Sequence, residues 1–231
     1  TYLAASPISY RDAKRTREGF SQLRPSIGDN AGIRNLLRAY DRISGGRSVP
    51  DLINPGDYKD EVLSSSDGSF IMIGSPRANH WTGLFLEQMY NRWRPRVTFG
   101  ADPESPDLRD VRVRVTKDGE VYLPDGFVDT DRRTLDFGFI IRAANPWNSH
   151  RMILIIAGRT ALGTHAAASA AVSELAIGTV KDRLEGIGIS LDDHEQPFCV
   201  ICQQSAGNGD RLPISDSLTV INTIRFHKLG E

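Results

Sequence analysis

The chain has few cysteines, no long hydrophobic run and no excess of either charge. Only two of its 231 residues are cysteine, which excludes a disulfide-stapled scaffold and predicts a reducing, cytoplasmic setting. The longest apolar stretch, residues 152–158, has the length of a strand and is far shorter than the roughly 18 residues typical of a membrane span. The formal net charge is −1, which argues against a bulk attraction to nucleic acid or to an anionic membrane.

The two cysteines, Cys199 and Cys202, are spaced as C-x-x-C, a pattern shared by redox pairs and by halves of zinc sites. They fall in an apolar stretch, residues 197–202, that reads as a strand. Residues three apart on a strand point to opposite faces, so the two thiols are not expected to act together. The five histidines show no metal-ligand spacing either, and we expect neither a metal nor a cofactor.

Strands and helices alternate towards both ends of the chain, which predicts a single α/β domain over residues 1–231. We expect a Rossmann-like, mostly parallel sheet of about six strands with helices on both faces. The middle of the chain differs, because residues 111–115 alternate between apolar and polar and Asp118-Gly119 is a hairpin-turn pair. An antiparallel hairpin is therefore predicted as an insertion at about residues 100–135, and one helix is predicted over residues 164–185.

The most informative stretch couples an apolar strand, residues 152–156, to a glycine turn and an alanine-rich helix. Gly158 and Gly163 have the spacing of a phosphate-binding loop, but Thr164 stands where that loop carries its lysine. Nucleotide hydrolysis of the usual kind is therefore not expected. The turn could still bind an anion through backbone N–H groups, with Arg159 as the cation and Thr164 as the helix N-cap. Alternatively, the two glycines serve only close packing.

A second strand–turn–helix junction follows the strand at residues 70–73. Gly74 and Ser75 form the turn, Arg77 is a candidate ligand for a phosphate or carboxylate, and Asn79 is a candidate helix cap. Alternatively, Arg77 is an ordinary surface cation. Two such junctions in one sheet open at the carboxyl ends of its strands, where α/β folds bind ligands, so both are predicted to contribute to one site.

A third group of polar residues flanks the strand predicted at residues 137–143. Asp136 could hold a ribose hydroxyl, while Asn145 and Trp147 could form a ring-stacking wall. Trp81 is a second candidate for stacking a base. The alternative is that Asn145 belongs to a turn and that Trp147 fills the core.

Glu87 is a single charge among apolar residues of the helix predicted at about residues 79–93. If it is buried, its pKa rises and it can act as an acid, base or nucleophile; if it faces water, it is an ordinary helix glutamate.

The basic run at residues 92–96 contains a tryptophan, but it lies near a helix end, where the helix dipole favours cations. Nucleic acid is therefore not an expected partner.

Residues 2–7, Tyr-Leu-Ala-Ala-Ser-Pro, resemble the opening strand of the nucleoside deoxyribosyltransferase-like proteins. This resemblance implies a flavodoxin-like or Rossmann-like sheet and the cleavage of N-glycosidic bonds by a glutamate near a Gly-Thr-x-x-Glu helix start. Residues 82–87, which end in Glu87, depart from that pattern in the order of threonine and glycine and in spacing. The chain is also similar to the Rossmann-like nucleotide sensor and effector domains of bacterial regulatory and defence systems.

Three functions fit these patterns. The first is a sensor or effector domain that binds a nucleotide-like or other anionic small molecule at the carboxyl edge of the sheet. The second is an N-glycosidase or transferase that acts on a nucleoside or dinucleotide through Glu87. The third is a protein-interaction module without a small ligand. Because the chain starts at Thr1, we expect it to be processed or part of a longer protein, and homo-oligomerisation stays open. No membrane partner is expected.

Overall fold

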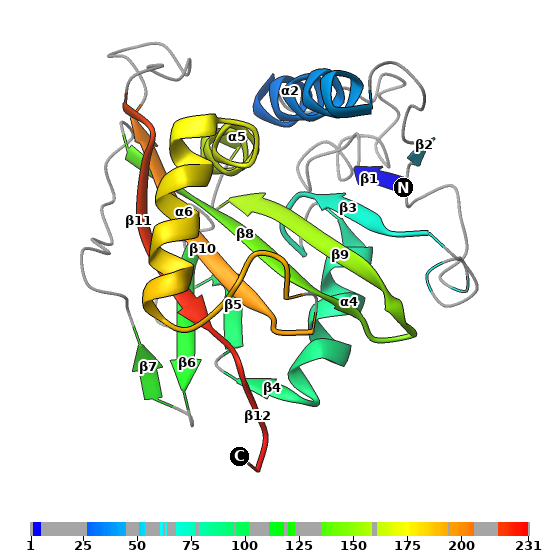
Figure 1. Ribbon diagram of the computed structural model, residues 1–231, viewed down its shortest axis with the longest axis vertical. Coiled ribbons are helices and arrows are strands. Elements are labelled where there is room, and N and C mark those ends of the chain that lie inside the picture. The colour runs from blue at the N-terminus through cyan, green and yellow to red at the C-terminus, as the bar shows by residue number, and fades with distance from the viewer. Residues whose placement is uncertain are drawn as a thin grey trace.

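The computed structural model describes residues 2–5, 27–44, 51–53, 61, 63, 68–76, 79–94, 96–101, 111–117, 120–122, 135–158, 161–193, 195–205 and 217–230. These residues form a mixed α/β fold around a seven-stranded sheet (Figure 1). Among the helices of the described residues, none is both long enough and apolar enough to cross a membrane.

The sheet has a parallel half and an antiparallel half. The parallel half contains, in spatial order, β2 (Asp51–Ile53), β1 (Tyr2–Ala5), β3 (Phe70–Ile73) and β9 (Asn148–Gly158). The sheet continues from β9 through antiparallel β8 (Leu135–Asn145), β10 (Phe198–Ser205) and β11 (Thr219–Arg225). The prediction of a mostly parallel sheet is therefore wrong. The direction reverses because a tight turn at Pro146 and Trp147 makes β8 and β9 a hairpin, which places β8 where a parallel strand was expected.

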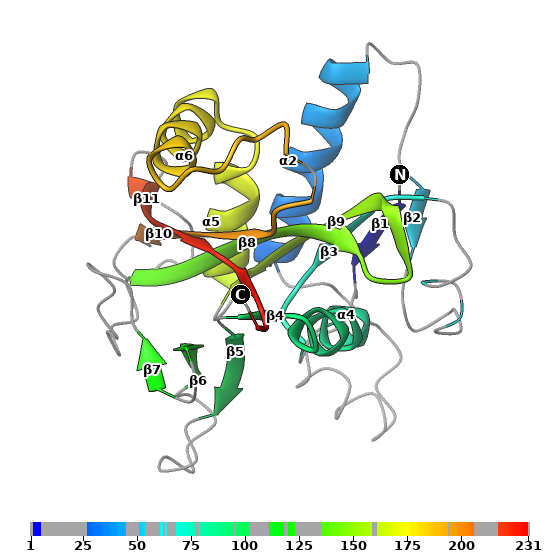
Figure 2. The same ribbon diagram turned by 60° about the horizontal axis from the view of Figure 1, so that its bottom comes forward.

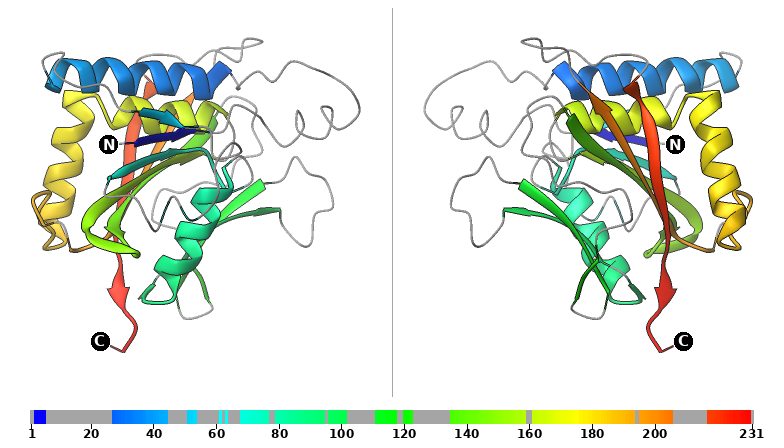
Figure 3. Two further views of the ribbon diagram at one scale, coloured as in Figure 1. Left: turned by 90° about the vertical axis from the view of Figure 1, so that its right-hand side faces the viewer. Right: turned by 90° about the vertical axis from the view of Figure 1, so that its left-hand side faces the viewer.

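Helices cover both faces of the sheet, as predicted (Figure 2). On one face lie α2 (Ile27–Ser44), α5 (Ala161–Ala170) and α6 (Glu174–Gly186), and on the other lies α4 (His80–Tyr90). Helices α2 and α5 run side by side (Figure 3). Consecutive strand residues serve opposite faces: Met72 and Ile155 belong to the core with α4, whereas Ile73 and Ile156 belong to the core with α5.

The helix predicted over residues 164–185 is two helices. Helix α5 ends at Ala170, and Ser173 begins α6 by accepting a hydrogen bond from Ala176 N at 3.3 Å. A serine that caps the following turn interrupts the alanine-rich periodicity on which the prediction rested. Helix α5 also begins at Ala161, so Thr164 lies inside the helix and is not its N-cap.

The predicted hairpin insertion is confirmed and has a third strand. Strand β6 (Val111–Lys117) pairs with β7 (Glu120–Tyr122) across the predicted turn, and β5 (Arg96–Ala101) pairs with the other side of β6. Tyr90 holds this small sheet to α4, because its hydroxyl donates to Val97 O and accepts from Val97 N, both at 2.7 Å. Strand β4 (Trp93–Arg94) pairs instead with β12 (His227–Lys228) near the end of the chain.

Candidate functional site

The two predicted glycine turns lie side by side at one edge of the sheet. Strands β3 and β9 are parallel neighbours with Ile73 opposite Ile156, and Gly74 N donates to Ile156 O at 2.9 Å. The turn that begins at Gly74 is therefore adjacent to the end of β9 at Gly158. We call this edge, where the ends of β1, β3, β9, β8 and β10 meet, the carboxyl edge.

At the β9–α5 junction the glycines allow backbone to touch backbone. A Cβ on Gly163 would lie 2.0 Å from Phe137 O, and a Cβ on Gly158 would lie 2.1 Å from Thr164 N. Gly138, which is opposite Gly158 in the β8–β9 register, would place its Cβ 2.2 Å from Gly163 O. Any residue type with a Cβ at these three positions would prevent α5 from approaching β8 and β9 this closely. The geometry matches the close-packing alternative for these glycines.

A carboxylate of the chain itself occupies the N-terminus of α5. Asp136 is 3% exposed, and its Oδ2 accepts from Gly163 N at 2.9 Å while its Oδ1 accepts from Phe137 N at 2.9 Å. The positive end of the helix dipole is thus already matched by a negative charge. An external anion beside Gly163 or Thr164 would face that carboxylate, and both residues are buried.

The β3–α4 junction is built differently. Gly74 adopts a φ of 105°, a conformation that favours glycine. Asn79 is 1% exposed and caps α4 as predicted: its Oδ1 accepts from Trp81 N at 3.1 Å and its Nδ2 donates to Ile73 O at 3.2 Å. Thr82 Oγ1 donates to Gly74 O at 3.0 Å. The first turn of α4 contains no acidic residue, and Ser75 in the turn before it is half-buried.

The third predicted group is divided between opposite edges of the sheet. Asp136 and Asn145 stand near the two ends of β8, about 30 Å apart at the usual rise per strand residue. Asn145 Oδ1 accepts from Trp147 N at 3.0 Å, which makes these residues the turn that the alternative describes. Trp147 packs against the core, and Trp81 is fully buried edge-on to Phe70 with ring centres 6.1 Å apart. The expectation that Asp136, Asn145 and a tryptophan line one pocket is therefore wrong.

Two further charged residues have clear positions. Glu87 is exposed on α4, so it lacks the buried setting that a catalytic role requires. Arg142 donates to Leu191 O and Asp193 O and lies 4.5 Å from the centre of the Phe198 ring, and burial lowers its pKa. Arg142 thus fastens a loop to the sheet.

The two candidate cations of the predicted site, Arg77 and Arg159, lie outside the described residues.

The sequence patterns missed a polar pair at the carboxyl edge. His165 Nδ1 lies 3.0 Å from Oε1 of Gln204, which is 2% exposed and directly opposite Asp136 in the β8–β10 register. With that oxygen as acceptor, Nδ1 of His165 is the donor of this hydrogen bond. The two residues are 39 positions apart, so only knowledge of the strand pairing could have joined them.

The cysteines lie on opposite faces of β10, as predicted. Cys199 belongs to the core with α4, and Cys202 belongs to the core with α5 and donates to Gly138 O at 3.4 Å. Burial raises the pKa of both thiols, that of Cys202 to about 12. Within the described residues, no three acidic, histidine or cysteine side chains are placed to share a metal ion.

Comparison of the chain with protein-family models, with curated proteins and with solved structures gives no significant match. The resemblance of residues 2–7 to nucleoside deoxyribosyltransferase-like proteins therefore stays a prediction.

Proposed function

We propose that the chain is a sensor or effector domain that binds an anionic, nucleotide-like small molecule at the carboxyl edge, between the ends of β1 and β3. The observation that carries this proposal is the topology at these two strands. Among the described elements, the next helix along the chain after β1 is α2, on one face of the sheet, whereas the next helix after its neighbour β3 is α4, on the other face (Figure 2). In α/β sheets, ligands bind outside the carboxyl ends of the strands at such a switch point.

The charge at the two helix N-termini decides where the anionic group of this ligand binds. Asp136 places a carboxylate at the start of α5, so a second negative charge is disfavoured there. The start of α4 is capped by the neutral amide of Asn79 and has no acidic residue in its first turn. We therefore assign the anionic group to the turn that runs from Gly74 through Ser75 towards α4, with Arg77 as its cation.

This assignment treats the parallel strands as a Rossmann-like unit to which an antiparallel half is added. His165, on α5, bonds to Gln204 of β10, which β8 and β9 separate from β3, so we assign it no contact with the ligand.

The cysteines bear on the location of the protein. Both are unpaired and lie on opposite faces of one strand, which suits a reducing, cytoplasmic location.

A thermal-shift screen against nucleotides, dinucleotides, cyclic nucleotides, nucleosides and inorganic phosphate tests the proposal. A ligand at 100 times its Kd adds about 2.7 kcal/mol to the free energy of unfolding. Arg77→Ala is expected to weaken binding of any hit by roughly 10- to 150-fold, because it removes one charge-assisted hydrogen bond. Arg159→Ala is the matched control at the other junction and is expected to leave the Kd unchanged.

Each outcome of this screen bears on the assignment. Equal affinity of the Arg77→Ala variant and the unmodified chain would contradict a role for the β3–α4 turn. Loss of affinity in the Arg159→Ala variant alone would return the anion to the β9–α5 junction. Chromatography of the incubated ligand would reveal cleavage, which the glycosidase alternative requires and which the exposed position of Glu87 does not support.

The interaction-module alternative has one observation in its favour. Leu175 and Ile177 on α6 are 83% and 40% exposed, large fractions for aliphatic side chains. This alternative would be favoured over the sensor if no ligand in the screen shifts the Tm and if a protein partner binds the unmodified chain but not a Leu175→Ser variant.

A further inference from the structure

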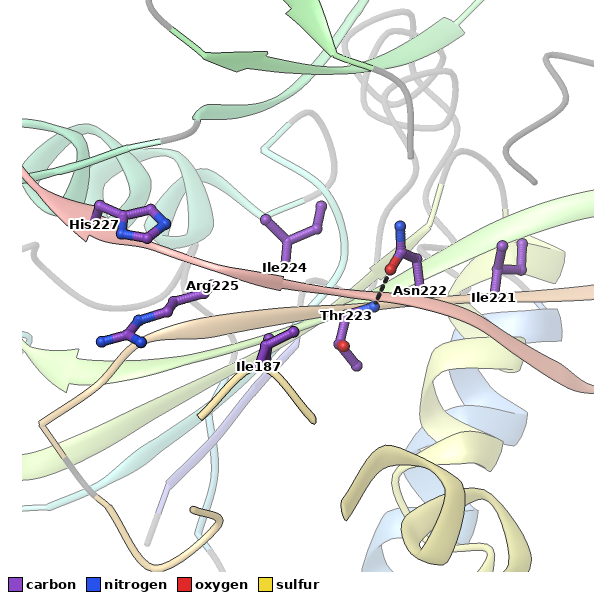
Figure 4. Close-up of a pocket in the computed structure, with 7 residues that line it drawn as sticks. All are labelled: Ile187, Ile221, Asn222, Thr223, Ile224, Arg225 and His227. Atoms are coloured by element: carbon purple, nitrogen blue, oxygen red, sulfur yellow. Dashed lines mark hydrogen bonds between the residues drawn. The ribbon is translucent and has the colours of Figure 1, made fainter. Parts of the chain in front are cut away.

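Strand β11 forms an outer edge of the sheet with the features of an aggregation site. It is the last strand on its side, and within the described part of the chain no strand pairs with its outer side. Residues 219–224 read Thr-Val-Ile-Asn-Thr-Ile, without a charge, a proline or a glycine. A shallow groove of about 550 Å³ follows this edge (Figure 4). An uncharged strand beside an apolar groove is a template on which another strand can pair.

The hydrogen-bond pattern shows which backbone groups face outwards. Phe226 N donates to Pro197 O at 3.3 Å, so the backbone groups of Phe226 face inwards, towards β10. Backbone groups alternate along an antiparallel strand, so those of Arg225 and Thr223 face outwards. The register shifts near Ile221, which has no partner residue on β10.

Two side chains form hydrogen bonds with outward-facing backbone groups of this edge. Arg183 Nη1 reaches from α6 and donates to Ile221 O at 2.7 Å. Asn222 Oδ1 accepts from Thr223 N at 2.8 Å, which Figure 4 marks with a dashed line. An added strand needs a carbonyl and an N–H from this stretch to form its first ladder bonds, and both are already bonded within the chain.

We propose that Arg183 and Asn222 keep the β11 edge from pairing with β11 of a second copy of this chain. A second copy presents the same uncharged strand, and antiparallel pairing centred on Asn222 would place Thr219 opposite Arg225 without opposing two like charges. The half-buried Ile221 and the exposed Ile187 of the groove would be covered in that pairing. The two hydrogen bonds therefore oppose an association that the apolar groove favours.

Sedimentation velocity of the full chain over a concentration series tests this proposal. The variant Arg183→Met with Asn222→Ala removes the donor and the acceptor, and it is expected to self-associate at least about tenfold more tightly than the unmodified chain. Methionine keeps the length of the arginine stem without its N–H donors, and alanine leaves no side-chain oxygen to accept from Thr223 N. Lys181→Met is the matched control, because it removes the same charge and adds the same side chain on α6, at a residue whose ion pair among the described residues is with Glu185, at 3.9 Å.

A third change identifies the surface that associates. Thr223→Pro deletes the outward N–H without removing a bond inside the sheet, so it is expected to return the double variant to a monomer. A double variant that stays as monodisperse as the unmodified chain would overturn the proposal. Equal association of the Lys181→Met control, or association that survives Thr223→Pro, would also overturn it.

Amide hydrogen exchange on the unmodified chain gives a second test, which does not depend on whether any variant folds. Both Thr223 and Arg225 present outward amides, but only Thr223 N has an acceptor within the described residues. The Thr223 amide is expected to exchange about tenfold more slowly than the Arg225 amide. Equal exchange of the two amides would show that Asn222 does not hold Thr223 N and would overturn its part in the proposal.

Discussion

The β3–α4 and β9–α5 junctions look alike in the sequence, yet they solve the same structural problem in different ways. Each links a buried strand to a helix through a glycine turn. At β3–α4 the glycine supplies an unusual backbone angle, with φ of 105° at Gly74, and a neutral amide caps the helix. At β9–α5 the glycines remove side-chain volume, and Asp136 brings a carboxylate from a neighbouring strand to the helix N-terminus.

This difference separates packing from binding in a glycine motif. A glycine that contacts the backbone of its own chain has no room left for a ligand at the same point. Gly163 is such a residue, because its missing Cβ would coincide with Phe137 O. Gly74 is constrained by its backbone angle instead, so its turn remains compatible with an external anion. The β9–α5 turn carried the stronger motif in the sequence, whereas we propose the β3–α4 turn as the place where the anion binds.

The largest effect is expected from Gly163→Ala, which tests the packing role of the β9–α5 glycines. The added Cβ would meet Phe137 O at 2.0 Å and Phe137 C at 2.7 Å, and neither backbone atom can move without separating α5 from β8. We expect the free energy of unfolding, measured by urea denaturation, to fall by about 3 kcal/mol or more.

The control for this variant is Gly178→Ala on α6. Gly178 is exposed, and a Cβ there would meet no atom within 4 Å. The same substitution is therefore expected to stabilise the protein by up to about 1 kcal/mol through helix propensity. A similar change in both variants would remove the steric explanation for Gly163.

The next effect tests the internal anion at α5. Asp136→Asn keeps the shape of the side chain but replaces one carboxylate oxygen by an NH₂ group, which cannot accept from both Gly163 N and Phe137 N. We expect a loss of about 2 kcal/mol in the free energy of unfolding by urea denaturation. Asp182→Asn, at an exposed position of α6, is expected to change stability little. Unchanged stability of the Asp136→Asn variant would mean that the carboxylate is not what stabilises the α5 N-terminus.

Sequence patterns were reliable where a contact is local and failed where it joins distant segments. The cap at Asn79, the pairing of β6 with β7 and the opposite faces of Cys199 and Cys202 each follow from neighbours along the chain. The carboxylate that meets Gly163 lies 27 residues away, on a strand whose pairing no local pattern specifies.

The antiparallel half of the sheet was missed for a related reason. A continuous apolar strand such as β9 reads the same whether its neighbours are parallel or antiparallel. The expectation that Asp136 and Trp147 line one pocket was an avoidable error, because these two residues flank a single predicted strand. Its length alone places them at opposite edges of the sheet.

A smaller effect is expected from the α4 cap. Asn79→Ala removes the acceptor of Trp81 N and the donor to Ile73 O, and it is expected to lower the free energy of unfolding by about 1–2 kcal/mol. Asn79→Asp keeps the acceptor, loses the donor and adds a negative charge at the helix start, where the dipole favours it. We therefore expect the aspartate variant to fall between alanine and the unmodified chain in urea denaturation. The added charge of the aspartate variant should also weaken the binding of an anion at this turn. Unchanged ligand affinity would count against the assignment of the site to the β3–α4 junction.

The smallest effect compares the two faces of the sheet through their buried thiols. A thiol without burial titrates near 9.0, whereas burial raises the pKa of Cys199 and raises that of Cys202 to about 12. As the pH rises through 9, the unfolded chain loses protons that the folded chain keeps, so the free energy of unfolding falls. Between pH 7 and pH 9 the expected loss is about 0.4 kcal/mol for each thiol. Cys199→Ala, on the α4 face, and Cys202→Ala, on the α5 face, should each remove about half of this pH dependence in urea titrations. If only one variant does so, the thiol on the other face already reaches water in the folded protein, and the core on that face is the less tightly closed of the two.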